Sequence, residues 1–277
     1  MFLEEHSLSL CNTMAKVIAI CNQKGGTGKT TTAINLSAYL ALLTKKVLLV
    51  DLDPQSNATS GIGINKHEVQ KSTYHVLLEE LELKEILLPT AIANLWVAPA
   101  NLDLTGAEVE LVSVLGREYR LKRALQNGKE NFDFVIIDSP PSLGLITINA
   151  LSAADSILIP VQCEYYALEG LTQLNNTVRL VKENLNSELT IEGVLLTMAD
   201  FRTNLTREVI QEARKYFKEK VYKTVIPRSI RLTEAPSFGK PIALYDKESS
   251  GARKYEELAK ELLSIPYTTE SITEGAI

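Results

Sequence analysis

A glycine-rich segment between an apolar run and a helical pattern constrains the fold of this chain most. Residues 24–30 read Lys-Gly-Gly-Thr-Gly-Lys-Thr, shortly after the apolar run 17–21. In residues 30–43, apolar side chains recur at 33, 34, 36, 40 and 43, close to the helical period of 3.6. A strand, a glycine turn and a helix in this order direct backbone N–H groups and the positive helix end to one place. The segment therefore predicts an α/β fold that holds phosphate groups at this turn.

Similar apolar runs recur along the chain and predict the rest of the sheet. They span residues 47–50, 95–98, 134–137, 157–161 and 191–197, and a second helical pattern spans 167–185. Strands that alternate with helices indicate a doubly wound, mostly parallel sheet with helices on both faces. We expect a single P-loop domain over residues 14–264, because 45% of the chain is hydrophobic and can form one core. Residues 1–13 are predicted to be a disordered extension and residues 265–277 a flexible tail.

Composition argues against a secreted, membrane-spanning or disulfide-stabilised protein. No run of about 18 apolar residues is present, and Glu4 and Glu5 stand where a signal peptide would be basic. The three cysteines show no metal-ligand spacing, and their odd number suits a reducing compartment. We therefore expect a cytoplasmic protein.

The glycine-rich turn departs from the common phosphate-loop signature at its first position. G-x-x-x-x-G-K-[ST] requires glycine at position 23, where this chain has Gln23 followed by Lys24. The second half of the signature, Gly28-Lys29-Thr30, is present. Lys29 is therefore expected to reach the β- and γ-phosphate oxygens of a nucleotide, and Thr30 to ligate Mg²⁺. A lysine-flanked glycine turn that binds no ligand is the alternative interpretation.

Acidic residues follow two of the apolar runs, where a metal and a water could be held beside the phosphates. Asp138 follows the run 134–137, at the carboxyl edge of a buried strand, and is the natural Walker B residue, holding Mg²⁺ through water. A cap of the next turn, which contains Pro140 and Pro141, is the alternative role for this carboxylate. Asp51 and Asp53 follow the run 47–50 and fall on the same side of an extended strand.

The charge of the chain is unevenly distributed. The net charge of −5 argues against a polyanion binder when the chain is taken as a whole. Residues 199–231, however, contain nine Lys and Arg against four Asp and Glu, a local net charge of +5, so the remainder carries −10. Within them, residues 206–220 form a helical pattern whose apolar face comprises positions 209, 210, 213, 216 and 217. Such an asymmetry is typical of a face for nucleic acid or anionic membrane, although a solvated surface helix is the commoner explanation of one basic helix.

The complete motif, K-G-G-x-G-K-[ST], is the signature of the deviant Walker A ATPases, and this chain resembles that family. From Ala15 to about Leu263 it is similar to the ParA/Soj-type chromosome or plasmid partition ATPases. The matching stretches are residues 22–36, 51–59, 160–171, 202–205 and 226–242. Together they are specific enough to imply the fold of that family and its activity, ATP hydrolysis with Mg²⁺.

The resemblance implies roles for the residues of the nucleotide site. Lys24 would reach across an ATP-sandwiched homodimer to the partner's phosphates, so the expected catalytic residues are Lys24, Lys29 and Asp53. Asp53 would orient the attacking water and is a second candidate for a water-mediated contact with Mg²⁺, while Asp51 would support the P-loop. The residues expected to contact the nucleotide are Lys24, Gly25, Gly26, Thr27, Gly28, Lys29, Thr30, Thr31, Met198 and Pro227.

The resemblance also implies a DNA binder that is switched by its nucleotide. An ATP-bound dimer would bind double-stranded DNA without sequence preference, through a surface that includes Arg202, Arg228 and Arg231. Hydrolysis, slow without an activator and stimulated by a ParB-like centromere-binding partner, would release the DNA. The ATP-bound form is therefore expected on the nucleoid.

Four alternatives to this function remain. A MinD-like ATPase, which cycles on a membrane and regulates division-site placement, needs a basic amphipathic C-terminal helix. Residues 254–263 instead carry three glutamates against two lysines, so we expect no stable membrane association. A nitrogenase-type iron–sulfur reductase needs two thiolates per subunit, but Cys163 has no obvious second ligand. A tyrosine autokinase would carry a terminal tyrosine cluster, whereas only Tyr267 lies in the last 20 residues. A small-molecule ligase or kinase on this scaffold stays open.

Overall fold

The computed structural model describes residues 15–164 and 169–266. The predicted extension 1–13 lies outside the described residues, as does most of the predicted tail 265–277. Residues 165–168, which include the start of the predicted helix 167–185, are outside them too. The prediction of a single domain over residues 14–264 stays a prediction.

The sheet of the described residues has the strand order β3-β4-β2-β5-β1-β6-β7-β8. All neighbouring strands run parallel except β3, which pairs antiparallel with β4. The strands are β1 (Lys16–Ile20), β2 (Val47–Asp51), β3 (Leu88–Pro89), β4 (Leu95–Ala98), β5 (Phe134–Asp138), β6 (Ser156–Gln162), β7 (Thr190–Ala199) and β8 (Val221–Pro227). The predicted mostly parallel sheet is confirmed.

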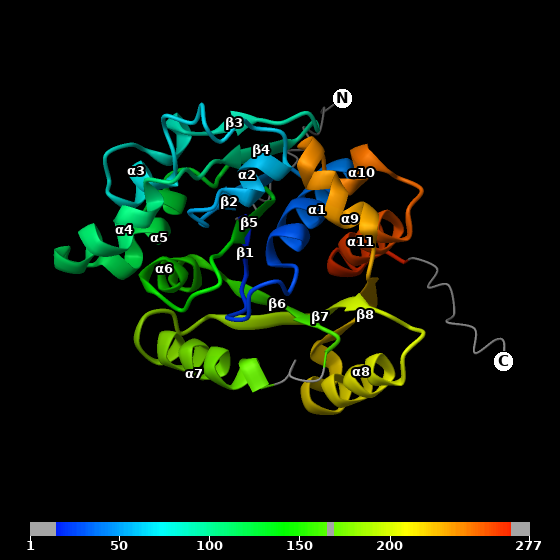
Figure 1. Ribbon diagram of the computed structural model, residues 1–277. Helices are drawn as coiled ribbons and strands as arrows, with labels where there is room; N and C mark the ends of the chain where they lie inside the picture. The colour runs from blue at the N-terminus through cyan, green and yellow to red at the C-terminus, as the bar shows by residue number, and fades with distance from the viewer. Residues whose placement is uncertain (1–14, 165–168, 267–277) are drawn as a thin grey trace, which may run out of the picture.

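Helices cover both faces of this sheet, as Figure 1 shows. They are α1 (Lys29–Leu42), α2 (Asn57–Gly61), α3 (Thr73–Leu77), α4 (Leu104–Glu110), α5 (Arg120–Gln126), α6 (Leu145–Ala153), α7 (Glu169–Asn184), α8 (Asn204–Phe217), α9 (Ile230–Glu234), α10 (Ile242–Tyr245) and α11 (Ser250–Leu262). Alternate side chains of β1 enter different cores: Val17 and Ala19 pack with α3 to α8, Ile18 and Ile20 with α1 and α9 to α11. The doubly wound arrangement therefore follows from strands that are apolar on both faces.

Two strands were not predicted, for different physical reasons. β8 contains the polar residues Lys223 and Thr224, and as an edge strand it shows no continuous apolar run. β3 has only two residues and exists through its pairing with β4, in which Leu88 faces Val97 and Pro89 faces Trp96. Neither strand therefore has a local pattern of its own.

The basic helix, α8, begins and ends differently from the prediction. It starts at Asn204 because the Thr203 side chain caps it, accepting a hydrogen bond from the backbone N–H of Thr206 at 3.3 Å. It ends at Phe217, where Lys218 takes a left-handed backbone conformation with φ of 51°. Tyr216, predicted on the apolar face, is 67% exposed, because the helix packs through a narrower face centred on its buried valine and alanine.

The C-terminal helix, α11, buries its apolar face inside the domain. Ala252, Tyr255 and Leu258 are buried where α11 packs against α1 and β8. The Glu261 carboxylate accepts hydrogen bonds from the backbone N–H groups of Lys223 and Thr224, at 2.7 and 3.0 Å, so the helix is also tied to the edge strand. Of the helices in residues 15–164 and 169–266, none combines the length and the apolar composition that crossing a bilayer demands.

Candidate nucleotide site and basic surface

The glycine-rich loop joins β1 to α1 and leaves the start of the helix open. Gly26 and Gly28 have φ angles of 74° and 87°, in the left-handed region that costs glycine little. Gly28 is the N-cap of α1, and no side chain caps the helix there. The N–H groups of the first turn of this 14-residue helix therefore remain available to an anion.

Strands distant in sequence hold the loop in place. The Thr197 hydroxyl, at the end of β7, donates to the carbonyl oxygen of Thr27 at 2.8 Å. On the other side, the Asn22 amide donates to the carbonyl oxygen of Pro160 in β6 at 2.7 Å, and its Oδ1 accepts from the N–H of Lys24 at 3.0 Å. The loop is thus fixed before any ligand arrives, which favours tight phosphate binding.

The side chain of Lys29 is buried within the loop. It is only 7% exposed, and its Nζ donates to the carbonyl oxygen of Lys24 at 3.3 Å. Burial lowers the pKa of Lys29, while the charges of Asp138, Cys21 and Asp53 oppose that shift. A cation held here has few protein partners, so a phosphate oxygen would stabilise it.

Asp138 lies at the carboxyl end of β5, beside the loop strand. It is fully buried, and neither carboxylate oxygen has a hydrogen-bond partner among the residues that the structure describes. Burial, followed by the charge of Asp51 in the same register on β2, raises the pKa of Asp138 well above its usual range. The nearby Thr30 side chain opposes this shift. An unpartnered buried carboxylate beside a hydroxyl fits a hard cation such as Mg²⁺.

The two aspartates after β2 have different surroundings. The Asp51 carboxylate accepts hydrogen bonds from the N–H of Asp53 at 3.0 Å and from the N–H and hydroxyl of Thr59 at 2.8 and 2.7 Å. It therefore organises the turn into α2, and its predicted support of the P-loop stays a prediction. Asp53 is 8% exposed, and its Oδ1 accepts from the N–H of Gln55 at 2.9 Å.

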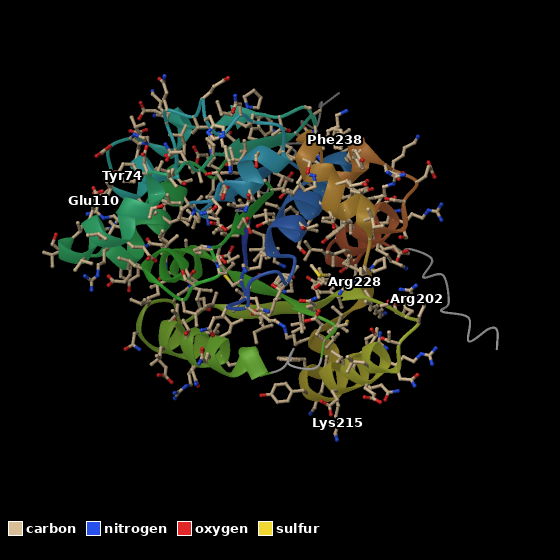
Figure 2. All side chains as sticks on the ribbon, in the orientation of Figure 1. Tyr74, Glu110, Arg202, Lys215, Arg228 and Phe238 are labelled. Atoms are coloured by element: carbon tan, nitrogen blue, oxygen red, sulfur yellow. The ribbon has the colours of Figure 1, made fainter. Side chains whose placement is uncertain are left out.

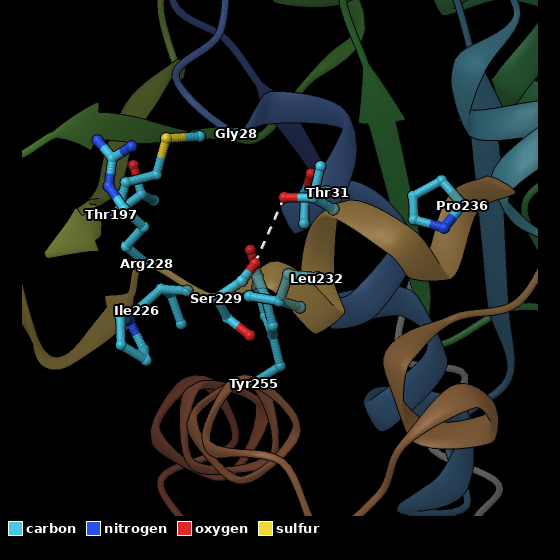
Figure 3. A pocket seen from close by; sticks show the side chains of 12 residues that line it. Gly28, Thr31, Thr197, Ile226, Arg228, Ser229, Leu232, Pro236 and Tyr255 are labelled. Atoms are coloured by element: carbon cyan, nitrogen blue, oxygen red, sulfur yellow. Dashed lines mark hydrogen bonds between the residues drawn. The ribbon is translucent and has the colours of Figure 1, made fainter.

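A cavity of about 320 Å³ lies beside the start of α1. Gly28 and Thr31 line it together with Met198 and Pro227, all four of them predicted to contact the nucleotide. The volume lies within the range of about 300–1,000 Å³ typical of small-molecule sites. Figure 3 shows Thr31 of α1 facing Ile226 and Arg228 across the opening, with Tyr255 of α11 below. The nucleotide residues predicted from distant motifs thus meet at one sheet edge.

The three arginines predicted to bind DNA lie at the surface near this edge. Each has an acidic partner on its own chain: Arg202 pairs with Asp200 at 2.7 Å and Arg231 with Glu234 at 3.1 Å. Arg228 lies 3.7 Å from Glu164. Figure 2 shows Arg202 at one end of α8, Lys215 on its outer side, and Arg228 toward the centre of the molecule. Further exposed basic side chains of this region are Arg207, Arg214, Lys218 and Lys220.

Comparison with known proteins decides the family. The model of the AAA domain family matches residues 15–191. The sporulation initiation inhibitor protein Soj of Bacillus subtilis is 62% identical over 249 residues, which is 90% of this chain and 98% of that protein. The chromosome-partitioning ATPase Soj of Treponema pallidum is 49% identical over 91% of this chain and 98% of its own length. The chain belongs to the ParA/Soj family.

A solved structure extends the family likeness to the nucleotide. Cobyrinic acid a,c-diamide synthase from Mycobacterium smegmatis, with bound ADP and magnesium, has a TM-score of 0.80 and 39% identity, covering 90% of this chain and 94% of that one. Related proteins of this fold therefore bind adenine nucleotide with magnesium. The two Soj proteins match at higher identity, and the name of the Treponema pallidum protein, a chromosome-partitioning ATPase, supports a partition ATPase over a biosynthetic enzyme for this member of the family.

Several residues of the site were not predicted. Thr197 secures the loop and Tyr255 lines the cavity, yet both lie far from the motifs in sequence. The stretch 226–242, which matched the family as a whole, was the available signal for Arg228 as a cavity residue. Burial raises the pKa of Cys21 to about 12 and that of Cys163 to about 11, which disfavours the thiolate forms that an iron–sulfur cluster requires.

Proposed function

We infer that this protein is an ATP-dependent partition ATPase, whose ATP-bound homodimer binds double-stranded DNA without sequence preference. The observation that carries the proposal is the proximity of Lys29 to Asp138 at the sheet edge where the cavity opens beside Gly28 and Thr31, with Lys24 in the same loop. A buried cation, an unpartnered carboxylate and an open helix start have a common use in holding a nucleoside triphosphate with its metal.

The nucleotide is held by groups of the loop and the cavity. Loop N–H groups and Lys29 bind the phosphates, Thr30 ligates Mg²⁺, and Asp138 holds the metal through water. Bound Mg²⁺ neutralises phosphate charge. The base occupies the cavity beside Met198 and Pro227, where backbone groups contact it.

Hydrolysis depends on positioning more than on proton removal. Asp53 orients the attacking water, since a carboxylate is a weak base toward water and phosphoryl transfer passes through a loose transition state. Lys24 adds positive charge to the partner subunit's phosphates when two subunits enclose the nucleotides. Turnover of one subunit alone is therefore slow.

DNA binds to the α8 surface of the dimer, which we define by the exposed basic residues Arg207, Arg214, Lys215, Lys218 and Lys220 in and after α8. A two-fold axis would join the two basic surfaces, including Arg202, Arg228 and Arg231 of each subunit, into a longer stripe that contacts phosphates. Hydrolysis separates the two subunits, which divides the stripe between them and releases the DNA. A ParB-like partner, which the resemblance to the partition ATPases implies, stimulates that step.

A DNA-binding titration tests this function directly. Duplex DNA would be titrated with ATP, with ADP and without nucleotide at two salt concentrations, beside anionic liposomes. We expect binding in ATP only, weakening steeply with salt. Equal binding in ATP and ADP would contradict the switch, and binding to liposomes alone would favour the membrane-cycling alternative, against which the buried apolar face of α11 argues.

A further inference from the structure

The carboxylate of Glu164 lies between two basic groups that the proposed function uses separately. Glu164 follows β6, and its Oε2 lies 3.5 Å from Nζ of Lys24. Its Oε1 lies 3.7 Å from Nη2 of Arg228 and also accepts a hydrogen bond from the Gln162 amide. The lysine expected to act on a partner's phosphates is thus bound to an anion of its own subunit.

The ion pair between Lys24 and Glu164 is weak enough for a phosphate group to displace the carboxylate. The side chains are 39% and 45% exposed, and at this exposure an ion pair shifts an equilibrium by only about twofold to fivefold. A triphosphate with several negative charges is a far stronger partner for the same ammonium group. The pair can therefore hold Lys24 when no partner phosphate is near and yield when one is.

The Gln162 and Arg228 contacts give Glu164 a fixed place in this exchange. Both hold Oε1, so the carboxylate keeps partners of its own when Lys24 leaves Oε2. We propose that Glu164 is a positioning residue that tethers Lys24 to its own subunit and so opposes dimerisation until ATP is present on both subunits. The inference rests on the proposed role of Lys24 across the dimer.

A dimerisation assay on the full chain tests the tether. Glu164→Gln removes the charge and keeps the shape, Glu164→Asp keeps the charge, and Lys24→Ala removes the tethered group. Glu82→Gln is the matched control, because it breaks a Lys–Glu pair with Lys84 in a turn distant from the loop. Each protein would be examined by analytical ultracentrifugation with Mg²⁺ and a slowly hydrolysed ATP analogue, without DNA.

We expect Glu164→Gln to raise the dimerisation constant by about tenfold, since two lysines are released per dimer. The ATP concentration for half-maximal turnover should fall while kcat stays within about twofold. Glu164→Asp should return most of the way to wild type, and the gain should shrink at high salt because the pair is half-exposed. A structural role of Glu164 in folding would produce neither the charge rescue nor the salt dependence.

The variants separate failure of the tether from failure of the proposed function. If Lys24→Ala dimerises as well as wild type, the role of Lys24 across the dimer is wrong and the function fails with it. If Lys24→Ala is impaired but Glu164→Gln dimerises no better than Glu82→Gln, only the tether is wrong. Weaker dimerisation of Glu164→Gln would also overturn it, by placing the carboxylate among the contacts of the dimer itself.

Discussion

The nucleotide edge of the sheet and the α8 surface both concentrate charge, but they hold it differently. At the nucleotide edge Lys29 and Asp138 are buried and have few or no partners, so the folded chain holds charges that a ligand would stabilise. Beside α8, Arg202 is exposed and paired with Asp200, and on α9 Arg231 is exposed and paired with Glu234. The first region is organised for one ligand, and the second presents a field that salt can screen.

This contrast predicts that single substitutions act strongly at the first region and weakly at the second. Water cannot replace a ligand contact that a buried charge loses, whereas an exposed arginine is hydrated and is only one of several cations that attract DNA.

Lys29→Ala should lower ATP turnover by about 10³-fold, since a preorganised buried cation beside the transferred phosphate is removed. Phosphate release would measure turnover, and the ATP-dependent rise in Tm would measure binding. Lys46→Ala, at an exposed lysine just before β2, is the control and should behave as wild type. Turnover within tenfold of wild type would show that the buried lysine is not part of the reaction.

Asp138→Asn should lower turnover by about 10²-fold yet stabilise the protein in the absence of nucleotide and Mg²⁺. Folding raises the pKa of Asp138, and that of Asp51 to about 6, so ionising these groups costs stability in the folded state. The stability contributed by the protonated forms is complete below about pH 4, near the pKa of the unfolded chain. It is lost as pH rises through the raised values.

The stability gain of Asp138→Asn over wild type should therefore be near zero at about pH 4 and grow toward neutral pH. Urea unfolding of both proteins across this range measures the difference. Adding ATP and Mg²⁺ should reverse its sign, because only the wild-type carboxylate would hold the metal. If the stability gain of Asp138→Asn does not change with pH, ionisation of the Asp138 carboxylate does not destabilise the folded protein.

Sequence alone predicted the parts of this site that are local. The loop of residues 24–30 lies between β1 and α1 as expected, and Asp138 ends β5, because a glycine turn and an apolar run are local signals. The contact of Thr197 with Thr27 joins residues 170 positions apart, and no local pattern encodes it. β8 was missed because Lys223 and Thr224 interrupt its apolar run.

Sequence alone also failed to predict the partners of the acidic residues. The predicted support of the P-loop by Asp51 stays a prediction; its hydrogen bonds come from Asp53 and Thr59, and the partner Thr59 is set by the turn into α2, which a motif does not specify. Composition indicated the basic region 199–231 correctly, but it did not indicate that Asp200 would pair with Arg202 or Glu234 with Arg231. Pairing is a property of the folded chain.

Reversing two charges on α8 should weaken DNA binding by at least about tenfold in ATP and reduce the slope of log affinity against log salt by about 4, because each dimer carries both substitutions twice. Arg214→Glu with Lys215→Glu is the test, because both side chains are exposed and neither lies in the cavity. Lys71→Glu with Lys84→Glu makes the same charge change at exposed positions elsewhere and is the control. Equal loss in both double variants would point to net charge alone, and turnover without DNA should change in neither.

Asp200→Asn should strengthen DNA binding by about twofold at low salt, the smallest of these effects, because the pair is solvent-exposed. The Arg202 side chain and backbone N–H donate to Asp200 and lower its pKa to about 2, so the acid is ionised at neutral pH and neutralises the arginine. Without that charge Arg202 is freer to contact phosphate. A gain that vanishes at high salt and is absent in Arg202→Ala would confirm the pairing as its origin, whereas weaker binding would show that Asp200 holds Arg202 in the orientation that DNA needs.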